Sequence, residues 1–242
     1  MILTCNFATY NLQAQSSRLL PIYSVETEEK LVSLTFDVAW GDEDMLEILD
    51  ILKINDVKAT FFIVGDWAEK YPHHVKNILE RGHDIGNHSY NHPHVTKITK
   101  DKVKEDIMKA HEVVKEIVDY EMDLYRPPYG EYNDIVIEAA TECNYYTIQW
   151  DVDSLDWKRY GIQPLIDKVL NHKNLTNGSI VLLHTGTDYT RYALDEIIKG
   201  LILRGYKIVP ISELIIRDNY RLDYTGRQHS EYENKDFGDF LY

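Results

Sequence analysis

Polar side chains that can act as acids, bases or metal ligands stand at the ends of five short apolar runs in this sequence. In chain order they are Asp37, the pair His88 and His92, Arg126, the pair Asp153 and Asp156, and His184. One coincidence of this kind means little, but five indicate that the fold brings these side chains together. In parallel α/β folds the carboxyl ends of the strands form a common rim, and active sites lie there. The sequence therefore predicts one reactive centre at the rim of a sheet or barrel.

The histidine pair is a candidate metal site. His88 and His92 lie four residues apart in a His-Ser-Tyr-Asn-His segment. Two imidazoles at this spacing on a helical turn can point at one metal ion. His94 is a further candidate, although Pro93 redirects the backbone between them. The alternative, surface histidines in a loop, stays open for this motif alone, and a third ligand has to come from a carboxylate near Asp37.

Asp37 and Arg126 are candidates for a buried ion pair. Asp37 closes an apolar run, so its carboxylate loses water and needs a partner, which favours a general base or a ligand. The alternative is a cap on the next helix, for which Asp42 and Asp44 are better placed. Arg126 opens the segment Arg-Pro-Pro-Tyr-Gly, in which the prolines fix φ and the glycine permits close backbone approach. Such a segment can hold a guanidinium against a carboxylate, but it also makes an ordinary turn.

Two later segments complete the set. Asp151, Asp153 and Asp156 follow a strand-like run and precede Trp157. Spaced aspartates suit Ca²⁺, but the glycine and the terminal glutamate of an EF-hand are absent. We therefore expect one aspartate to orient a histidine and Trp157 to form a wall of the pocket. His184 also ends an apolar run. A lone histidine there is more often a hydrogen-bonded core residue, but the shared rim favours a general acid.

The elements that must position these residues alternate along the chain. The expected strands are residues 31–36, 59–64, 83–87, a weak run before Arg126, 145–150, 179–183 and 206–211. The expected helices are residues 45–54, 102–118, 134–140, 164–170 and 192–203. In residues 102–118 the apolar side chains recur at three- and four-residue spacing and define one stripe. The alternation predicts an α/β fold with parallel strands and helices outside, first as a distorted barrel and second as an open doubly wound sheet.

Length and charge narrow the class of protein. The 242 residues, of which 44% are apolar, can bury the core of one domain. We expect a polar arm at residues 1–30, the domain at 31–217 and a polar, acidic tail at 218–242. The net charge of −14 disfavours binding to nucleic acid or to anionic lipid. No apolar run approaches ~18 residues, so we expect no membrane span, and no signal peptide or anchor is visible.

Taken in order, these segments resemble the five motifs of the polysaccharide deacetylase family, the NodB-homology group or carbohydrate esterase family 4. They read Thr35-Phe-Asp37-Val38, His88-Ser-Tyr-Asn-His92, Arg126-Pro-Pro-Tyr-Gly130, Asp153-Ser-Leu-Asp156-Trp157 and Leu182-Leu-His184. The resemblance covers about residues 31–216 and implies a distorted (β/α)7-type barrel of the NodB-homology fold. Residues 20–26, together with the segment that follows Phe36, look closest to the sporulation-associated branch.

The resemblance implies a role for each catalytic residue. Asp37 resembles the family's catalytic base and Arg126 the residue that orients it. His184 resembles the general acid, tuned by Asp156. The remaining three positions, Tyr129, Trp157 and Leu182, resemble the substrate-binding residues. The backbone N–H of Tyr129 would face the oxyanion, and the other two side chains would line the acetyl pocket.

One position departs from the family pattern. His88 and His92 resemble ligands of a divalent metal, with zinc expected first and cobalt or nickel as alternatives. The family's third ligand, the second aspartate of the first motif, is Val38 here, and valine cannot coordinate a metal. Asp42 is the tentative replacement because Gly41 permits a sharp turn. Water in that position, or a barrel without its metal, are the alternatives.

These roles imply metal-assisted hydrolysis of an N-acetyl group on a glycan such as peptidoglycan or a chitin-like chain of N-acetylglucosamine. One alternative is the removal of acetyl esters from xylan by the same groups. The other is a catalytically silent glycan-binding domain, which Val38 suggests. Since such glycans lie outside the membrane, we expect an extracytoplasmic or cell-surface monomer with a glycan as its partner. An upstream start or a removed anchor would account for the missing export signal.

Overall fold

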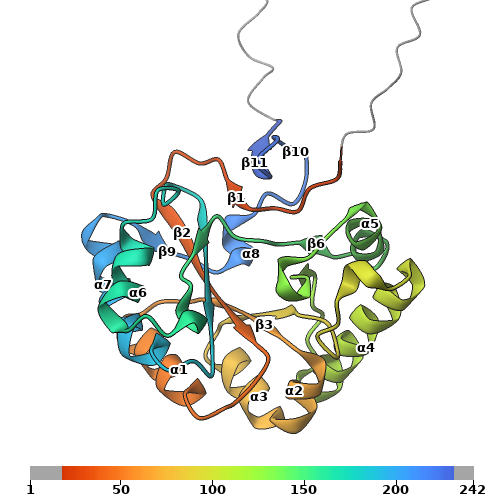
Figure 1. The fold of residues 1–242 in the computed structure, drawn as a ribbon, viewed down its shortest axis with the longest axis horizontal. Helices are drawn as coiled ribbons and strands as arrows, with labels where there is room; N and C mark the ends of the chain where they lie inside the picture. Colours follow the sequence, from red (N-terminus) through yellow and green to blue (C-terminus); the bar gives the residue numbers. More distant parts are fainter. Residues whose placement is uncertain (1–17, 232–242) are drawn as a thin grey trace, which may run out of the picture.

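A curled sheet runs through residues 18–231, the part of the chain that this computed structural model describes (Figure 1). Its strands are β1 (Ser24–Val25), β2 (Leu31–Val38), β3 (Thr60–Ile63), β4 (Asp84–Asn87), β5 (Leu124–Tyr125), β6 (Tyr146–Thr147), β7 (Val152–Asp153), β8 (Ser179–His184), β9 (Lys207–Ile208), β10 (Tyr220–Leu222) and β11 (Arg227–Ser230). Their order across the sheet is β10-β11-β1-β8-β2-β3-β4-β5-β6, with β7 paired to β8 and β9 paired to β2. Residues 1–17 and 232–242, which hold parts of the expected arm and tail, lie outside the described range.

Parallel pairing dominates the sheet between β8 and β6, and the helices lie outside it (Figure 1). Strands with both faces covered read as nearly continuous apolar runs, and all four residues of β3 are buried accordingly. Ile22, just before β1, bridges to Ile148, just after β6, so the N-terminal segment links the two sides of the curl. The predicted α/β class with a distorted, barrel-like sheet is confirmed, and the open doubly wound alternative is wrong.

The helices alternate with the strands as the sequence pattern predicts. They are α1 (Met45–Ile54), α2 (Gly65–Lys70), α3 (Pro72–Glu80), α4 (Lys100–Val118), α5 (Asp134–Glu142), α6 (Ile162–Leu170), α7 (Thr190–Leu203) and α8 (Ile211–Leu214). The five expected helices are confirmed, and the apolar stripe of α4 is buried. Side-chain caps set two of their starts: Thr99 accepts from the backbone N–H of Lys102, and Asn133 from that of Val136. None of the described helices is long and apolar enough to span a membrane.

Some elements differ from the expectation. Helices α2 and α3 were not predicted, because Pro72 interrupts the pattern between them and instead starts α3 at its first position. Strand β6 is shorter than the expected run 145–150, because the chain beyond it makes only the single bridge from Ile148 to Ile22. Pro210 lacks a backbone N–H, so the expected strand 206–211 stops at Ile208 and Ile211 begins α8.

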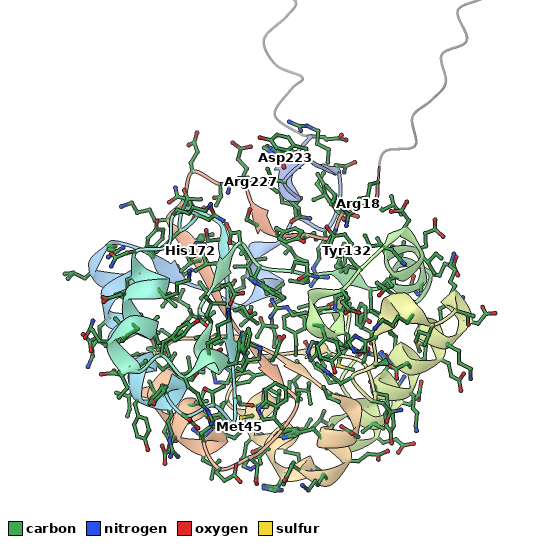
Figure 2. All side chains as sticks on the ribbon, viewed as in Figure 1. Arg18, Met45, Tyr132, His172, Asp223 and Arg227 are labelled. Carbon is green, nitrogen blue, oxygen red and sulfur yellow. The ribbon has the colours of Figure 1, made fainter. Side chains whose placement is uncertain are left out.

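Polar segments at both ends of the described range also join the sheet. Strand β1 pairs with β8 and with β11, and β10 and β11 form a hairpin that carries Asp223 and Arg227 (Figure 2). At the N-terminal end, the guanidinium of Arg18 lies 4.8 Å from the ring centre of Tyr132. Backbone hydrogen bonds and one buried side chain, Gln228, hold the hairpin, and neither produces an apolar sequence pattern. The domain boundaries at residues 30 and 217 remain predictions.

The register of the parallel strands brings the predicted polar residues to one rim. Asp37 of β2 lies beside His184 of β8, and Asn87 of β4 lies beside Tyr125 of β5. The chain therefore leaves β4 at His88 next to the point where β5 leads into Arg126. The carboxyl ends of four strands thus supply the residues of the candidate site.

Candidate active site

A cavity of about 440 Å³ opens at the carboxyl ends of β2, β4 and β8. The residues that line it are Asp37, Trp40, His88, His92, Tyr129, Gly130, Trp150, Asp153, Trp157, Leu182 and His184. All five predicted segments contribute to this list. Arg126 and Asp156 are buried and bond to lining residues. The prediction that the five segments meet at one rim is confirmed.

Asp37 is held by a buried arginine. Arg126 is fully buried, and its Nη1 donates to Asp37 Oδ1 at 2.8 Å and to Thr35 Oγ1 at 2.9 Å. Its Nη2 donates to the backbone oxygen of Gln149 at 3.1 Å, and the guanidinium lies 4.1 Å from the ring centre of Phe62. These contacts allow the guanidinium one orientation, so they fix the carboxylate that it binds.

The surroundings of Asp37 keep its carboxylate ionised. Burial acts to raise the pKa of Asp37, but its electrostatic interactions with His88, Arg126 and His184 outweigh burial and lower it. Oδ1 is taken by the arginine, while Oδ2 lies 3.4 Å from His88 Nε2. A desolvated carboxylate with one oxygen engaged and the other directed at an imidazole can accept a proton from a bound reactant.

The two histidines of the second motif face each other. His88 Nδ1 lies 2.8 Å from the backbone oxygen of Arg126, and a carbonyl can only accept, so Nδ1 carries the proton and Nε2 presents its lone pair. His88 Nε2 and His92 Nε2 are 3.2 Å apart. Two nitrogens each ~2.0–2.1 Å from a tetrahedral zinc ion would lie about 3.3 Å apart. The pair therefore has the spacing of two ligands on one cation.

Both imidazoles are kept neutral. Burial lowers the pKa of His88. Burial, followed by the charge of His88, lowers the pKa of His92 to about 4. Neutral imidazoles are the form that binds a metal, so the chemistry of these two donors fits a divalent cation.

A third ligand is not supplied where the family resemblance places it. Val38 is fully buried and packs in the hydrophobic core, because successive residues of a strand point to opposite faces and Asp37 occupies the cavity side. Gly41 makes the sharp turn that was expected, with φ of +67°, but Asp42 then lies against His74 of α3, with Oδ2 3.3 Å from Nε2. His94, the further candidate ligand, is also engaged elsewhere, with its Nδ1 3.0 Å from Glu131 Oε1.

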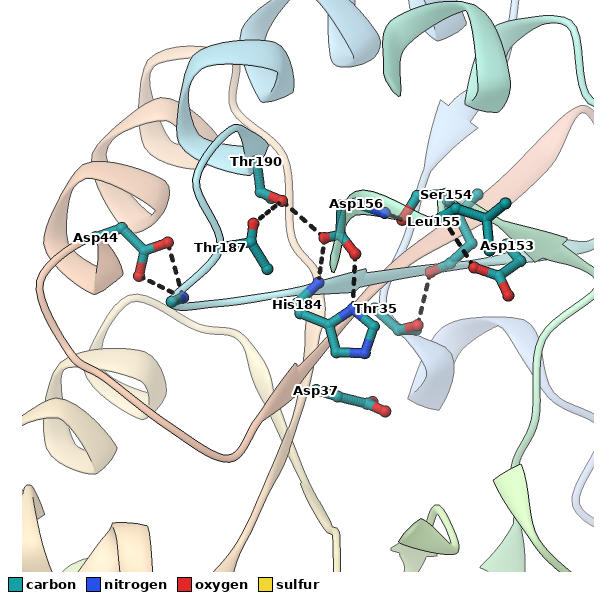
Figure 3. Close-up of polar contacts among 12 residues, drawn as sticks. Thr35, Asp37, Asp44, Asp153, Ser154, Leu155, Asp156, His184, Thr187 and Thr190 are labelled. Carbon is teal, nitrogen blue, oxygen red and sulfur yellow. Dashed lines mark hydrogen bonds and ion pairs between the residues drawn. The ribbon is translucent and has the colours of Figure 1, made fainter. Parts of the chain in front are cut away.

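His184 is held by Asp156 on the opposite wall. Its Nδ1 lies 2.7 Å from Asp156 Oδ1, and its backbone N–H donates to Asp156 Oδ2 at 2.7 Å (Figure 3). Thr190 Oγ1 donates to the same Oδ2, also at 2.7 Å. Burial acts to lower the pKa of His184, but the bond to Asp156 and its charge outweigh burial and raise it. Figure 3 shows the imidazole between Asp156 and Asp37. Proton exchange with the cavity is therefore left to Nε2.

The three aspartates in and just before the fourth motif have separate positions. Asp151 accepts from the backbone N–H of Ile180 at 2.9 Å and from Ser179 Oγ at 3.0 Å, and burial raises its pKa to about 6. Asp153 lines the cavity and accepts from the backbone N–H of Leu155 at 2.9 Å. Asp156 is thus the aspartate that orients a histidine, as the sequence led us to expect of one of the three.

Aromatic side chains form the exposed rim of the cavity. Tyr129 is 58% exposed, Trp157 53% and Trp40 47%, and the indole of Trp40 stacks on His184 with ring centres 6.0 Å apart. Aromatic faces of this kind suit the apolar faces of sugar rings. Neither Trp40 nor Trp150 was predicted as a site residue. The signal that was available for Trp40 is its place three residues beyond Asp37 in a polar loop.

Three residues that line the same cavity have left-handed backbone conformations. Tyr129 has φ of +60° and the adjacent Gly130 has φ of +66°. A Cβ on Gly130 would lie 2.9 Å from the Trp150 ring. His92 also has a positive φ, of +52°. Non-glycine residues held in this region concentrate at functional sites, because the surrounding structure must maintain them against their own preference.

The chain is similar in sequence to known proteins. Residues 24–148 match the family model described as polysaccharide deacetylase. A peptidoglycan-N-acetylglucosamine deacetylase of Bacillus cereus is 38% identical over 187 residues, which cover 76% of this chain and 67% of that protein. The uncharacterized protein YlxY of Bacillus subtilis is 34% identical over 195 residues, or 81% of this chain. Those residues are 60% of YlxY, so this chain spans about three fifths of that relative's length.

A solved structure gives the same likeness in three dimensions. BA3943 of Bacillus anthracis, described as a CE4 family pseudoenzyme, has a TM-score of 0.78 and 36% sequence identity. The superposition covers 83% of this chain and 71% of BA3943. A mutant of BA3943, described as having restored enzymatic activity, has a TM-score of 0.77 and 37% identity over 81% of this chain and 71% of its own.

Proposed function

The chain belongs to the polysaccharide deacetylase family, and from this membership we propose that it is a hydrolase that removes N-acetyl groups from a glycan. The substrate class is an N-acetylglucosamine polymer of the peptidoglycan or chitin type. One observation carries the proposal: Asp37 and His184 lie beside each other in one cavity, the first held by Arg126 and the second by Asp156.

Asp37 acts as the general base. Its pKa is lowered, so it is ionised at neutral pH, and Arg126 holds one of its oxygens in place. The free oxygen takes a proton from the water whose oxygen attacks the acetyl carbon. The backbone N–H of Tyr129 then donates to the oxyanion that forms on the carbonyl oxygen.

His184 acts as the general acid. Its raised pKa keeps more of it protonated near neutral pH than an ordinary histidine. Since Asp156 binds Nδ1, His184 gives the Nε2 proton to the amide nitrogen as the carbon–nitrogen bond breaks. The products are acetate and the free amino sugar. Leu182 and Trp157 enclose the methyl group of the acetyl on the cavity wall.

A divalent cation, zinc first and cobalt or nickel as alternatives, fits the pair His88 and His92. When bound, it supplies polarisation of the acetyl carbonyl. The Nε2 atoms of the two imidazoles would hold it, since they lie 3.2 Å apart and both rings are neutral. Val38 contributes no ligand, so the cation would have fewer protein ligands than the Asp-His-His set of the family.

Val38 favours a second candidate function, a glycan-binding domain without catalysis. Its side chain is fully buried in the core, where the family has a coordinating carboxylate. The aromatic rim of Tyr129, Trp157 and Trp40 would still bind a sugar chain. The similarity to BA3943, which is described as a pseudoenzyme, supports this second candidate.

Acetate release separates the two candidates. The full chain would be incubated with N-acetylglucosamine oligomers, with peptidoglycan and with acetylated xylan, each with added zinc or cobalt. Hydrolysis predicts acetate from an N-acetylated glycan and its loss in Asp37→Asn. If folded protein binds the same oligomers but releases no acetate, the hydrolase is refuted and the glycan-binding function is supported. Acetate from xylan alone would instead identify an esterase.

The place of action is part of the same proposal. Relatives of this chain are named for acting on peptidoglycan, a cell-wall polymer, so we place its activity outside the membrane or at the cell surface. We further propose that it acts as a monomer and belongs to the sporulation-associated branch. Sedimentation of the purified chain tests the first of these, and expression timing in the source cell tests the second.

A further inference from the structure

Three side chains with metal-binding atoms converge outside the cavity, where the loop after β2 meets the start of α3. They are Asp42, His73 and His74, and each offers one ligand atom within 4.8 Å of the other two. We propose that they form a second divalent-cation site, distinct from the pair His88 and His92. It shares no residue with the cavity lining.

The spacing of the donors is long for a charged hydrogen bond and matches that of two ligands on one metal ion. Asp42 Oδ2 and His74 Nε2 lie 3.3 Å apart. An ionised carboxylate and an N–H donor normally approach to ~2.7–2.9 Å. Two ligands of one tetrahedral zinc ion lie about 3.3 Å apart, given bond lengths of ~2.0–2.2 Å. The ring centres of His73 and His74 are 4.1 Å apart, which brings the second imidazole to the same place.

His74 also contains a buried polar atom that the protein does not satisfy. The residue is 3% exposed, and its Nδ1 has no hydrogen-bond partner among the described residues. With Nε2 facing Asp42, each protonation state of the ring leaves one buried nitrogen unpaired, which is costly in a native interior. In the tautomer that carries its proton on Nδ1, a cation between Nε2 and the Asp42 carboxylate would pair both of those atoms, although it would not reach Nδ1.

The surroundings of His74 restrict its imidazole ring and leave the proposed site open to solvent. The ring stacks on Trp67 with centres 6.0 Å apart, which restricts its orientation. His73 is exposed and Asp42 is half-buried, so water can complete the coordination from the solvent side.

The donor set selects the class of cation. Two imidazoles and one carboxylate suit zinc, cobalt or nickel, whereas Ca²⁺ and Mg²⁺ prefer oxygen ligands throughout. The site would also act on the cavity through the loop. Trp40, which stacks on His184, lies two residues before Asp42, and the intervening Gly41 accepts from Trp67 Nε1 at 2.6 Å. A cation bound by Asp42, His73 and His74 would link this loop to α3.

The test counts metal ions on the full chain. Protein stripped with a chelator would be loaded with zinc or cobalt, freed of excess ion by gel filtration and analysed for bound metal. His73→Gln is the main variant because the side chain is exposed, so its loss does not disturb the core. We expect it to bind one equivalent fewer than the native chain, or to bind that equivalent about tenfold or more weakly. Asp42→Asn should act in the same way.

Two further variants make the count specific. His172→Gln is the matched control, because this histidine is outside both metal sites and should leave the count unchanged. His92→Gln removes a ligand of the cavity pair and should leave the equivalent that depends on His73. The proposal is overturned if the native chain binds no metal, or if His73→Gln binds as much metal as tightly as the native chain. Since no outcome depends on acetate release, failure of the hydrolase proposal leaves this test intact.

Discussion

Replacing Asp156 by asparagine is the sharpest test of the acid assigned to this cavity. The carboxylate receives three bonds of 2.7 Å, from His184 Nδ1, from the backbone N–H of His184 and from Thr190 Oγ1 (Figure 3). Asparagine has nearly the same shape, so Asp156→Asn removes the charge with little change in packing. Its side chain can keep one acceptor but cannot stabilise a charged imidazole.

The size of the effect follows from the charge that is lost. A hydrogen bond to a charged group contributes ~1.5–3 kcal/mol, so a transition state that needs protonated His184 slows by about 10- to 150-fold. The sign follows from burial. Without Asp156, burial dominates and lowers the pKa of His184, so the alkaline limb of the pH–rate profile moves to lower pH.

Stability should change with pH in the matching direction. The pKa of His184 is raised in the folded protein, so protonation stabilises the native chain below the unfolded pKa. That contribution is lost as the pH rises through the folded pKa. Asp156→Asn should therefore lower the free energy of unfolding more at acid pH than at alkaline pH, as measured by urea denaturation.

Asp153→Asn is the matched control for both measurements. Asp153 lines the same cavity, but its carboxylate binds the backbone N–H of Leu155, and its charge raises the pKa of His184 less than Asp156 does. The pH–rate profile is measured for all three proteins, and NMR titration of the His184 ring reads its pKa even where turnover is slow. An unchanged His184 pKa in folded Asp156→Asn would refute the reasoning, as would an equal shift in Asp153→Asn.

Three other substitutions test the rest of the site. Arg126→Leu leaves Asp37 buried without its partner and should cost about 3–5 kcal/mol of unfolding free energy at neutral pH. Because the pKa of Asp37 is lowered, this loss should shrink as the pH falls through it; a pH-independent loss in urea denaturation would contradict the ion pair. Val38→Asp places a carboxylate in the core, on the face of β2 away from Asp37, and should cost about 1–3 kcal/mol both in chelator and with zinc; a melting temperature restored by zinc would show that this carboxylate reaches the cation after all. Gly130→Ala sets a Cβ 2.9 Å from Trp150 at a positive φ and should cost about 1–3 kcal/mol by thermal melting, whereas a neutral effect would show that the segment relaxes.

The residue types at the strand ends were enough to predict which segments meet at the candidate active site. Asp37, His184 and the His88–His92 pair each follow an apolar run, and parallel strands bring their carboxyl ends together whatever the details of packing. The five longer helices were also visible, because their apolar residues recur with the helical period. These features depend on neighbours within a few residues, which the sequence displays directly.

Other features depend on partners far away in the chain. Asp42 is only two residues beyond Trp40, which lines the cavity, yet it lies against His74. The hydrogen bond from Thr190 to Asp156 joins residues 34 positions apart. The pairing of β1 with β8 and β11 recruits polar segments that have no apolar pattern. Such contacts arise from the way the curled sheet packs, because a backbone pair or a buried polar bond gains its strength from burial that only assembly creates. Local patterns carry no trace of that burial, so the direction in which Asp42 points had to be seen in the folded chain.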